Sequence, residues 1–177
     1  MVHKVAGLFA GIGGLELGLS RAGHHTQLLC EIDPSASAVL KHHPDFHTAQ
    51  LTQNVCQLKG EDLRSVSLIA AGFPCQDLSQ AGRTQGLDGK NSGLIGEVFR
   101  LLREEDVPEV LLENVPFMMQ LSRGAALEKI LSEFERMGYS WAYRVIDALA
   151  FGLPQRRERI FIIASKIRDP RTILLSG

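Results

Sequence analysis

The sequence lacks the long apolar run that a membrane-spanning helix needs. Hydrophobic residues make up 45% of its 177 residues, but they occur in short runs, far from the roughly 20 consecutive apolar residues of a membrane span. The amino terminus also lacks the basic stretch, apolar segment and cleavage site of a secretory signal, because residues 5–10 already have the pattern of a core strand. Both absences predict a soluble, cytoplasmic protein without a membrane partner.

Cysteine is scarce, and its spacing excludes two common uses. Cys30, Cys56 and Cys75 form an odd set without the short paired spacings of metal ligands. Neither a disulfide framework nor a metal site is therefore predicted.

An excess of positive charge is also missing. The formal net charge is -1, although proteins gain most of their nonspecific affinity for nucleic acid from basic contacts to phosphate. The chain by itself therefore lacks the charge of a complete nucleic-acid-binding surface. The charge is uneven, however, since from Phe151 onward the basic residues Arg156, Arg157, Arg159, Lys166, Arg168 and Arg171 outnumber Glu158 and Asp169. This distribution predicts a local basic edge.

Short apolar, β-branched runs alternate with amphipathic stretches, without an internal repeat or a low-complexity linker. This alternation, in a chain long enough for one domain, is typical of an α/β fold with a mostly parallel sheet and helices on both faces. We expect strands over residues 5–10, 27–32, 66–71, 110–112, 141–146 and 159–164, and helices over 15–21, 92–103, 125–137 and from Pro34 onward, where Asp33 can cap the helix start. The connection between the last two strands is too short for a helical crossover, so this pair should be antiparallel.

The first motif is a glycine-rich turn, residues 9–14 (Phe-Ala-Gly-Ile-Gly-Gly), between the first expected strand and helix. Glycines there let the backbone turn tightly and approach a ligand. Glu31 follows Gly11 by 20 positions, at the end of the second strand, where a carboxylate can accept hydrogen bonds from ribose hydroxyls. The combination predicts a nucleoside-type cofactor, whereas Glu16 in place of a third glycine argues against NAD. A glycine turn that serves only packing is the alternative.

Cys75 lies in the second motif, residues 72–76 (Gly-Phe-Pro-Cys-Gln), just past an expected strand. The carboxyl ends of strands in an open parallel sheet are the usual place for chemistry. Pro74 rigidifies the approach, and the glycine-rich, polar residues 77–93 could close over a substrate. Cys75 is a candidate nucleophile if nearby positive charge or amides lower its pKa, and an inert buried thiol is the alternative.

Glu113 and Asn114 end a further expected strand, in the sequence Glu-Asn-Val. If the strands are neighbours, the carboxylate lies beside the loop of the second motif. Partial burial would raise the pKa of Glu113, so that it stays protonated or shares a proton with a base nitrogen. A solvated strand-end charge followed by a turn residue is the alternative.

The fourth motif, residues 155–159 (Gln-Arg-Arg-Glu-Arg), opens the last expected strand. Alternation along a strand puts Arg157 and Arg159 on one face and Arg156 and Glu158 on the other. Aligned guanidinium groups can fork onto a phosphate or a base carbonyl. A solvated basic strand start is the alternative.

In this order and spacing the four motifs resemble those of the cytosine-5 DNA methyltransferases, over residues 4–164. The resemblance implies a Rossmann-like methyltransferase fold, S-adenosylmethionine as methyl donor, double-stranded DNA as substrate, and a place in the bacterial cytoplasm within a restriction–modification system. It also implies the chemistry. Carbon-5 of cytosine is a weak nucleophile, so a thiolate adds to carbon-6 while an acid at N3 absorbs the developing charge, and the base must leave the stacked duplex.

The resemblance also assigns roles to particular residues. Among catalytic residues, Cys75 resembles the attacking thiolate, Glu113 the acid at N3, and Arg157 and Arg159 the groups that hold the base carbonyl and adjacent phosphate. Pro74, Gln76 and Asn114 are similar to residues that support them. The residues that resemble cofactor ligands are Phe9 against the adenine, Gly11, Gly13 and Gly14 at the methionine end, Glu31 at the ribose, and Ile32, Gln50, Leu51 and Pro74.

The sequence departs from the family pattern in three places. Gly7 stands where the family usually has an aspartate, and Gln50 stands where an aspartate usually meets the adenine amine, so weaker cofactor binding is expected. After Ser165 the family continues into a target-recognition region. We therefore expect a cofactor-binding and catalytic domain over residues 1–165 and the start of a truncated or separately supplied target-recognition region over 166–177, with negligible activity unless a second subunit or the missing part is present.

Two other functions remain open. A tRNA cytosine-5 methyltransferase would carry the same motifs, and methyl incorporation into duplex DNA and into tRNA would separate the two. A catalytically inactive regulatory or binding module of the same fold would explain the missing aspartates and the short length. The intact Cys75, Glu113 and Arg159 argue against such a module.

Overall fold

The computed structural model describes residues 1–74 and 93–175. The strands and α-helices follow one another in the order β1 Lys4–Leu8, α1 Gly14–Arg21, β2 His25–Cys30, α2 Pro34–His42, β3 Gln50–Thr52, β4 Leu68–Gly72, α4 Gly93–Glu104, β5 Glu109–Asn114, α5 Ala125–Arg136, β6 Ser140–Asp147, β7 Glu158–Ser165 and α6 Arg171–Leu174. Short 3-10 helices form several connections, among them η2 (Val55–Gln57) and η3 (Gly60–Leu63) between β3 and β4, and η6 (Ala148–Phe151) after β6.

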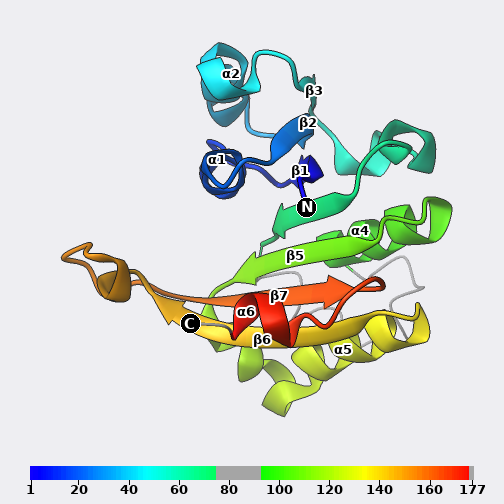
Figure 1. Cartoon of the computed structure of the whole chain (residues 1–177), viewed down its shortest axis with the longest axis vertical. Helices are drawn as coiled ribbons and strands as arrows, with labels where there is room; N and C mark the ends of the chain where they lie inside the picture. The colour runs from blue at the N-terminus through cyan, green and yellow to red at the C-terminus, as the bar shows by residue number, and fades with distance from the viewer. Residues whose placement is uncertain (75–92, 176–177) are drawn as a thin grey trace. The chain divides into compact units, whose positions relative to one another are not determined.

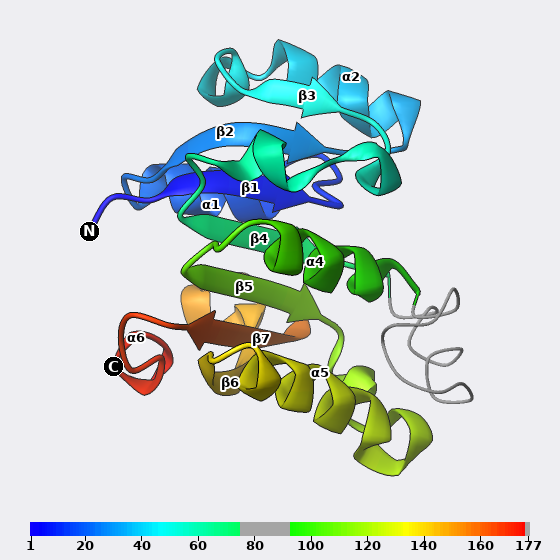
Figure 2. The same cartoon turned by 90° about the vertical axis from the view of Figure 1, so that its right-hand side faces the viewer.

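The strands form one mixed sheet with the order β3-β2-β1-β4-β5-β7-β6 (Figure 1). β1 runs parallel to both β2 and β4, and β2 runs parallel to β3, whereas β6 and β7 are antiparallel. Helices lie on both faces of the sheet (Figure 2). This topology confirms the predicted α/β class and the predicted antiparallel pair.

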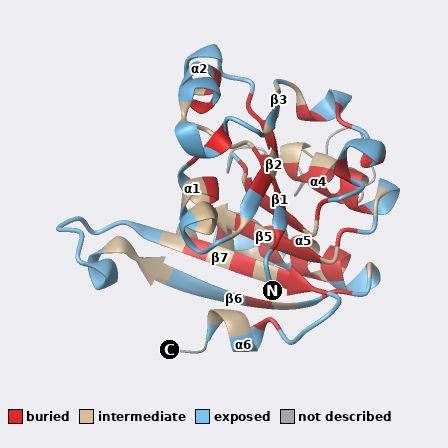
Figure 3. Ribbon diagram, turned by 45° about the horizontal axis from the view of Figure 1, so that its top comes forward, coloured by how far each residue is buried: buried red, intermediate tan, exposed pale blue. Residues whose placement is uncertain are grey.

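Two compact units are distinguished by their internal contacts, and the first comprises residues 1–72 with 100–110. Strands β1, β2 and β4 of this unit are buried along most of their length (Figure 3) because apolar residues occupy most of their positions, as in the fully buried Val5 of β1 and Ile69 of β4. Beside them lies a cluster of Leu29, Leu40 and Phe46, here called the Phe46 cluster. Ala10 and Leu17 pack against this cluster, so the first turn and helix are anchored to β2 and α2.

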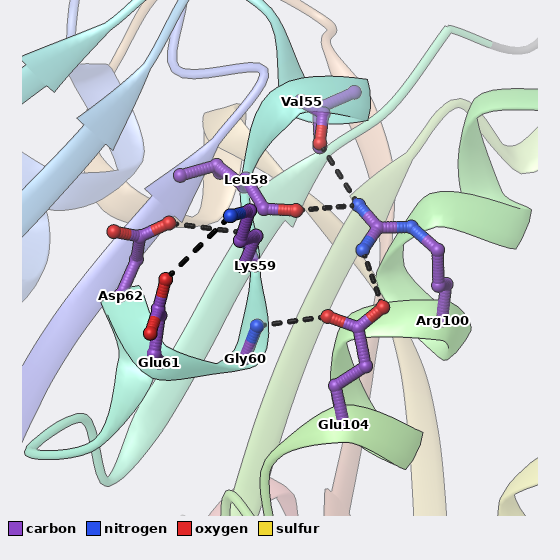
Figure 4. A network of polar contacts seen from close by, with 8 residues as sticks. All are labelled: Val55, Leu58, Lys59, Gly60, Glu61, Asp62, Arg100 and Glu104. Atoms are coloured by element: carbon purple, nitrogen blue, oxygen red, sulfur yellow. Dashed lines mark hydrogen bonds and ion pairs between the residues drawn. The ribbon is translucent and has the colours of Figure 1, made fainter.

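A polar network fixes the long connection from β3 to β4 within this first unit (Figure 4). The guanidinium of Arg100 on α4 donates hydrogen bonds to the carbonyl oxygens of Val55 at 3.1 Å and Leu58 at 2.9 Å, and to the carboxylate of Glu104 at 2.7 Å. Glu104 also accepts a hydrogen bond from the Gly60 amide at 2.8 Å. One helical ion pair therefore satisfies backbone groups on both η2 and η3.

The second unit comprises residues 73–99 with 111–177. Its β6 and β7 are each eight residues long and pair continuously from Ser140 opposite Ser165 to Asp147 opposite Glu158. Helix α5 contributes Phe134 to the core, where its ring lies edge-on to Phe99 at 5.1 Å between ring centroids and to Tyr139 at 5.6 Å.

The predicted elements agree with the structure in type, with shifted bounds. β1 ends at Leu8 rather than at residue 10, because the backbone enters the left-handed region at Phe9. β3 and α6 were not predicted; they are only three and four residues long, too short to show a periodic pattern. Within the described residues, no helix is both long and apolar enough to span a membrane.

Candidate functional site

The glycine-rich turn follows β1 at the point where the strand order of the sheet reverses. The chain moves outward from β1 to β3 and then returns to β4 on the other side of β1, and ligands of open α/β sheets bind at such a switch point. Phe9, Gly11 and Gly13 all have positive φ angles, 56°, 55° and 85° respectively. A positive φ at phenylalanine is uncommon and shows that the surrounding structure dictates this backbone.

The two central glycines of the turn are needed for different reasons. At Gly13 an added Cβ would lie 2.5 Å from Cε2 of Phe46 and 2.8 Å from Cδ2 of Leu40, so packing excludes a side chain. At Gly11 an added Cβ would meet nothing within 4 Å. Open space at Gly11 lets a ligand approach the backbone there, which fits the predicted role of this turn.

Glu31 connects the end of β2 to this turn. Its carboxylate accepts hydrogen bonds from the Gly11 amide at 2.7 Å and from the Asp33 amide at 2.8 Å, and the residue is only 9% exposed. Asp33 caps α2 as predicted, by accepting a hydrogen bond from the Ala36 amide at 2.7 Å. The structure therefore brings Glu31 and the glycine turn together. Its role toward a ribose stays a prediction.

The other predicted cofactor residues of the first unit, Ile32, Gln50 and Leu51, differ in how far they are exposed. Ile32 is 71% exposed, an unusual position for a large apolar side chain directly after a buried strand. β3 lies beside β2 with Gln50 opposite Leu28. Gln50 is exposed, whereas Leu51 packs against the Phe46 cluster. Leu51 is half-buried and also lines a surface pocket beside α2, together with Pro34 and Ser37. Its role toward a cofactor stays a prediction, like those of Ile32 and Gln50.

Glu16 is the residue of this site that sequence reasoning missed. In the sequence, Glu16 stands only where a dinucleotide-binding turn would have its third glycine. In the structure its side chain is 1% exposed and lies in the space that Gly7 leaves open because it has no side chain. Burial raises the pKa of Glu16 to about 7, and the negative charge of Glu31 adds to this rise. The sequence feature that could have predicted this contact is the combination of Gly7 on the strand with an acid, Glu16, on the helix that follows.

In the second unit, Asn114 ties the end of β5 to the segment that follows β4. Its Nδ2 donates a hydrogen bond to the carbonyl oxygen of Phe73 at 2.9 Å, and its Oδ1 accepts one from the Val115 amide at 2.8 Å. Both Asn114 and Phe73 are buried, with 5% and 3% exposure. Pro74 follows on the surface. Cys75 and Gln76, the next two residues, lie outside the described residues.

Glu113 and Arg159 form an ion pair that the sequence did not predict. Nε of Arg159, at the start of β7, lies 2.9 Å from Oε1 of Glu113, at the end of β5, and both side chains are about a quarter exposed. The Arg159 guanidinium also donates to the carbonyl oxygen of Glu158 at 2.7 Å. A charge-assisted contact of this kind fixes the direction in which the carboxylate points.

Arg157 is exposed and lies just before β7, and its amide donates a hydrogen bond to Oδ1 of Asp147 at 2.9 Å. The Leu149 amide donates to the same oxygen, and these two backbone bonds hold the pKa of Asp147 below its usual range. The structure therefore joins Arg159 to Glu113, but gives Arg157 only a backbone anchor.

The described cysteines differ sharply in environment. Burial, followed by the charge of Glu31, raises the pKa of the Cys30 thiol to about 12. Such a thiol stays protonated at neutral pH and is a poor nucleophile. Cys56 is exposed. Cys30 is therefore a core residue of β2.

The mixed sheet, the turn at its switch point and the polar strand ends define a Rossmann-like methyltransferase class, and comparison with known proteins gives the family. The profile of the family described as C-5 cytosine-specific DNA methylase matches residues 3–172. The chain is 46% identical over 177 residues to the type II methyltransferase M2.BsuMI of Bacillus subtilis (strain 168), covering 98% of this chain and 44% of that protein. It is 33% identical over 182 residues to the type II methyltransferase M.AquIA of Picosynechococcus sp., covering 94% and 73%.

A solved structure agrees with these relatives. The crystal structure of a putative DNA modification methyltransferase encoded within an Escherichia coli prophage superimposes with a TM-score of 0.74 at 28% identity, covering 92% of this chain and 46% of that chain. The chain thus belongs to the C-5 cytosine-specific DNA methylase family. It spans less than half the length of M2.BsuMI and of the prophage protein, and about three quarters of M.AquIA.

Proposed function

We propose that this chain provides the cofactor-binding and catalytic part, residues 1–165, of a DNA (cytosine-5-)-methyltransferase that uses S-adenosylmethionine and double-stranded DNA. The observation that carries the proposal is the hydrogen bond from Asn114 to the Phe73 carbonyl, because it ties the Glu-Asn-Val strand end to the backbone two residues before Cys75. The family match and the type II methyltransferase relatives support it.

S-adenosylmethionine, when bound, supplies a methyl group on a positively charged sulfonium. We assign its methionine end to the turn of residues 9–14, where Gly11 leaves the backbone open. Its ribose is assigned to Glu31, whose carboxylate has acceptor capacity beyond its two amide partners. Phe9, the exposed Ile32 and Gln50 are assigned to the adenine. The position of Glu31 supports this placement of the cofactor, because a carboxylate at the end of the second strand usually binds the ribose in folds of this kind.

The chemical steps are assigned to residues of the second unit, whose range includes Cys75. The Cys75 thiolate forms a bond from Sγ to carbon-6 of a cytosine that has rotated out of the duplex. The displaced electron pair moves toward N3, where Glu113 holds a proton, and returns to make carbon-5 nucleophilic. After carbon-5 has taken the methyl group, a base removes its proton, the Sγ to carbon-6 bond breaks and the thiolate is restored.

Two arginines support these steps in the proposal. Arg159 is a positioning residue for Glu113, since its guanidinium holds one carboxylate oxygen at 2.9 Å and leaves the other for the base. Arg157, exposed beside the start of β7, is assigned to a phosphate of the flanking backbone, a contact typical of arginine in protein–DNA interfaces.

We also propose that target recognition lies in a further region, supplied beyond these residues or by a second polypeptide. The greater length of M2.BsuMI and the net charge of -1 support this, because recognition of duplex DNA needs more basic surface than this chain carries. The Asn114 contact ties β5 to the Phe73 carbonyl and provides no base readout.

Methyl transfer from tritiated S-adenosylmethionine tests the function. The chain is assayed alone and mixed with the carboxyl-terminal half of M2.BsuMI, on bacterial genomic DNA and on tRNA, with Cys75→Ser as the matched variant. We expect transfer to DNA only in the mixture, and none with Cys75→Ser. Transfer to tRNA alone would refute the substrate, and full activity of the lone chain would refute the need for a further region. As a positive control, the amino-terminal half of M2.BsuMI is mixed with the same carboxyl-terminal half. If this control transfers methyl groups and the mixture with our chain does not, catalysis by this chain is refuted.

A further inference from the structure

Glu16 carries a buried carboxyl oxygen that has no partner. The residue lies in the first turn of α1 and is 1% exposed. Its Oε2 has no hydrogen-bond partner among the described residues. Burying a polar oxygen without a partner costs free energy, so such a group in a native site calls for a ligand or a specific reason.

The position of this carboxyl is set by Gly7 on β1. A Cβ added to Gly7 would lie 2.7 Å from both Cδ and Cγ of Glu16, so a side chain at position 7 would require the Glu16 carboxyl to move. The Glu16 carboxyl therefore occupies the volume that a side chain at position 7 would fill, beside the strand that leads into the turn of residues 9–14. Position 7 is also where relatives of this sequence were expected to have an aspartate.

The electrostatics around this carboxyl favour a cation. Glu31 is the charged group whose field raises the pKa of Glu16 further, and its own partners are the amides of Gly11 and Asp33. Among the described residues, neither carboxylate is ion-paired with a lysine, arginine or histidine. The two acids beside the open glycine turn therefore have no positively charged side chain among the described residues, and a cationic ligand group would be stabilised there.

We infer that Glu16 binds the positively charged methionine end of S-adenosylmethionine and so replaces the acid that Gly7 cannot supply. This inference rests on the proposed cofactor. Its α-ammonium group is a three-proton donor that can satisfy Oε2 in a charge-assisted hydrogen bond. The carboxyl of Glu16, with its pKa of about 7, is half protonated in the free protein near neutral pH and loses its proton when the ammonium group binds.

Isothermal titration calorimetry on the full chain tests this role with three ligands. S-adenosylmethionine and S-adenosylhomocysteine carry the amino-acid portion, whereas 5′-methylthioadenosine lacks it. We expect Glu16→Gln, which keeps the shape and removes the charge, to weaken binding of the first two by about tenfold to a hundredfold, the range of hydrogen bonds to charged groups. Binding of 5′-methylthioadenosine should not change. In buffers of different ionisation enthalpy at pH 7, the wild-type chain should release about half a proton on binding S-adenosylmethionine, and Glu16→Gln none.

An exchange of the two positions provides the second variant. Gly7→Asp alone should weaken binding, because its side chain meets Glu16. Gly7→Asp combined with Glu16→Ala should restore binding of S-adenosylmethionine to within a few fold of wild type. Equal weakening of all three ligands by Glu16→Gln, or no weakening at all, would overturn the assignment and leave Glu16 as a packing residue. Absence of binding of all three ligands to the wild-type chain would instead refute the proposed cofactor.

Discussion

Asn114→Ala probes how the backbone at Phe73, two residues before Cys75, is held. It removes the hydrogen bond to the Phe73 carbonyl and the one from the Val115 amide, each worth about 0.5–1.5 kcal/mol. The Phe73 carbonyl is also left buried without a donor, which costs about 1–3 kcal/mol. The Val115 amide is half-buried, so water can replace part of its loss. We expect a decrease in the free energy of unfolding of about 2–4 kcal/mol, or about 5–15 °C in Tm for a chain of this size.

Urea unfolding followed by circular dichroism measures this decrease. Gln120→Ala is the matched control, because it truncates an exposed amide side chain in the same unit; surface changes of this kind stay within about 0.5 kcal/mol. Asn114→Asp should be at least as damaging as Asn114→Ala, since a carboxylate cannot donate to the Phe73 carbonyl. If Asn114→Ala unfolds at the same urea concentration as Gln120→Ala, the reasoning is refuted.

Three further predictions concern the first unit. Arg100→Ala should lower the free energy of unfolding by about 1–3 kcal/mol, because the carbonyls of η2 lose their donor; equal unfolding midpoints in urea for this variant and wild type would contradict that. Because the pKa of Glu16 is raised from 4.5 to about 7 on folding, protonated Glu16 contributes to the free energy of unfolding. This contribution should be complete below pH 4.5 and should be lost as the pH rises through about 7. The free energy of unfolding should decrease by about 3 kcal/mol across this pH range. Glu16→Gln should not show this decrease when unfolding is measured at the same pH values. In a Cys75→Ser background, a thiol reagent at pH 8 should modify the exposed Cys56 quickly and leave the buried Cys30, whose pKa is about 12, unmodified until the chain unfolds.

The fold class was predictable because the longer elements carry strong local patterns. The apolar strand around Ile69, the Asp33 cap of α2 and the short link between β6 and β7 each follow from local sequence, and the structure confirms them. β3 escaped prediction because three residues with a partly exposed Leu51 show no alternation. Its place in the sheet comes from pairing with β2, a long-range contact that a local pattern does not encode.

The candidate site was predictable as a set of strand ends but not as a set of contacts. Parallel strands place their carboxyl ends at one edge, so Glu31 and Glu113 could be singled out from position alone. The partners of these groups depend on register and side-chain geometry. That is why the pairing of Arg159 with Glu113 and the hold of Asn114 on Phe73 came only from the structure.

Glu16 shows a different limit of sequence reasoning. The dinucleotide-binding fingerprint is defined by three glycines, and Glu16 stands where the third glycine would be. On that basis the sequence says only that Glu16 does not match the fingerprint. Its significance depends on the space beside Gly7 that its carboxyl fills, and this space arises only when β1 and α1 pack together.

Covalent trapping determines whether Cys75 is the nucleophile. The chain, mixed with the carboxyl-terminal half of M2.BsuMI and S-adenosylmethionine, is incubated with duplex DNA in which 5-fluorocytosine replaces cytosine, so that the base cannot lose its substituent at carbon-5 and the adduct persists. Peptide mapping by mass spectrometry should place the modified nucleotide on Cys75. An adduct on any other residue, or the same yield from Cys75→Ser, would contradict the assignment of Cys75 as the nucleophile.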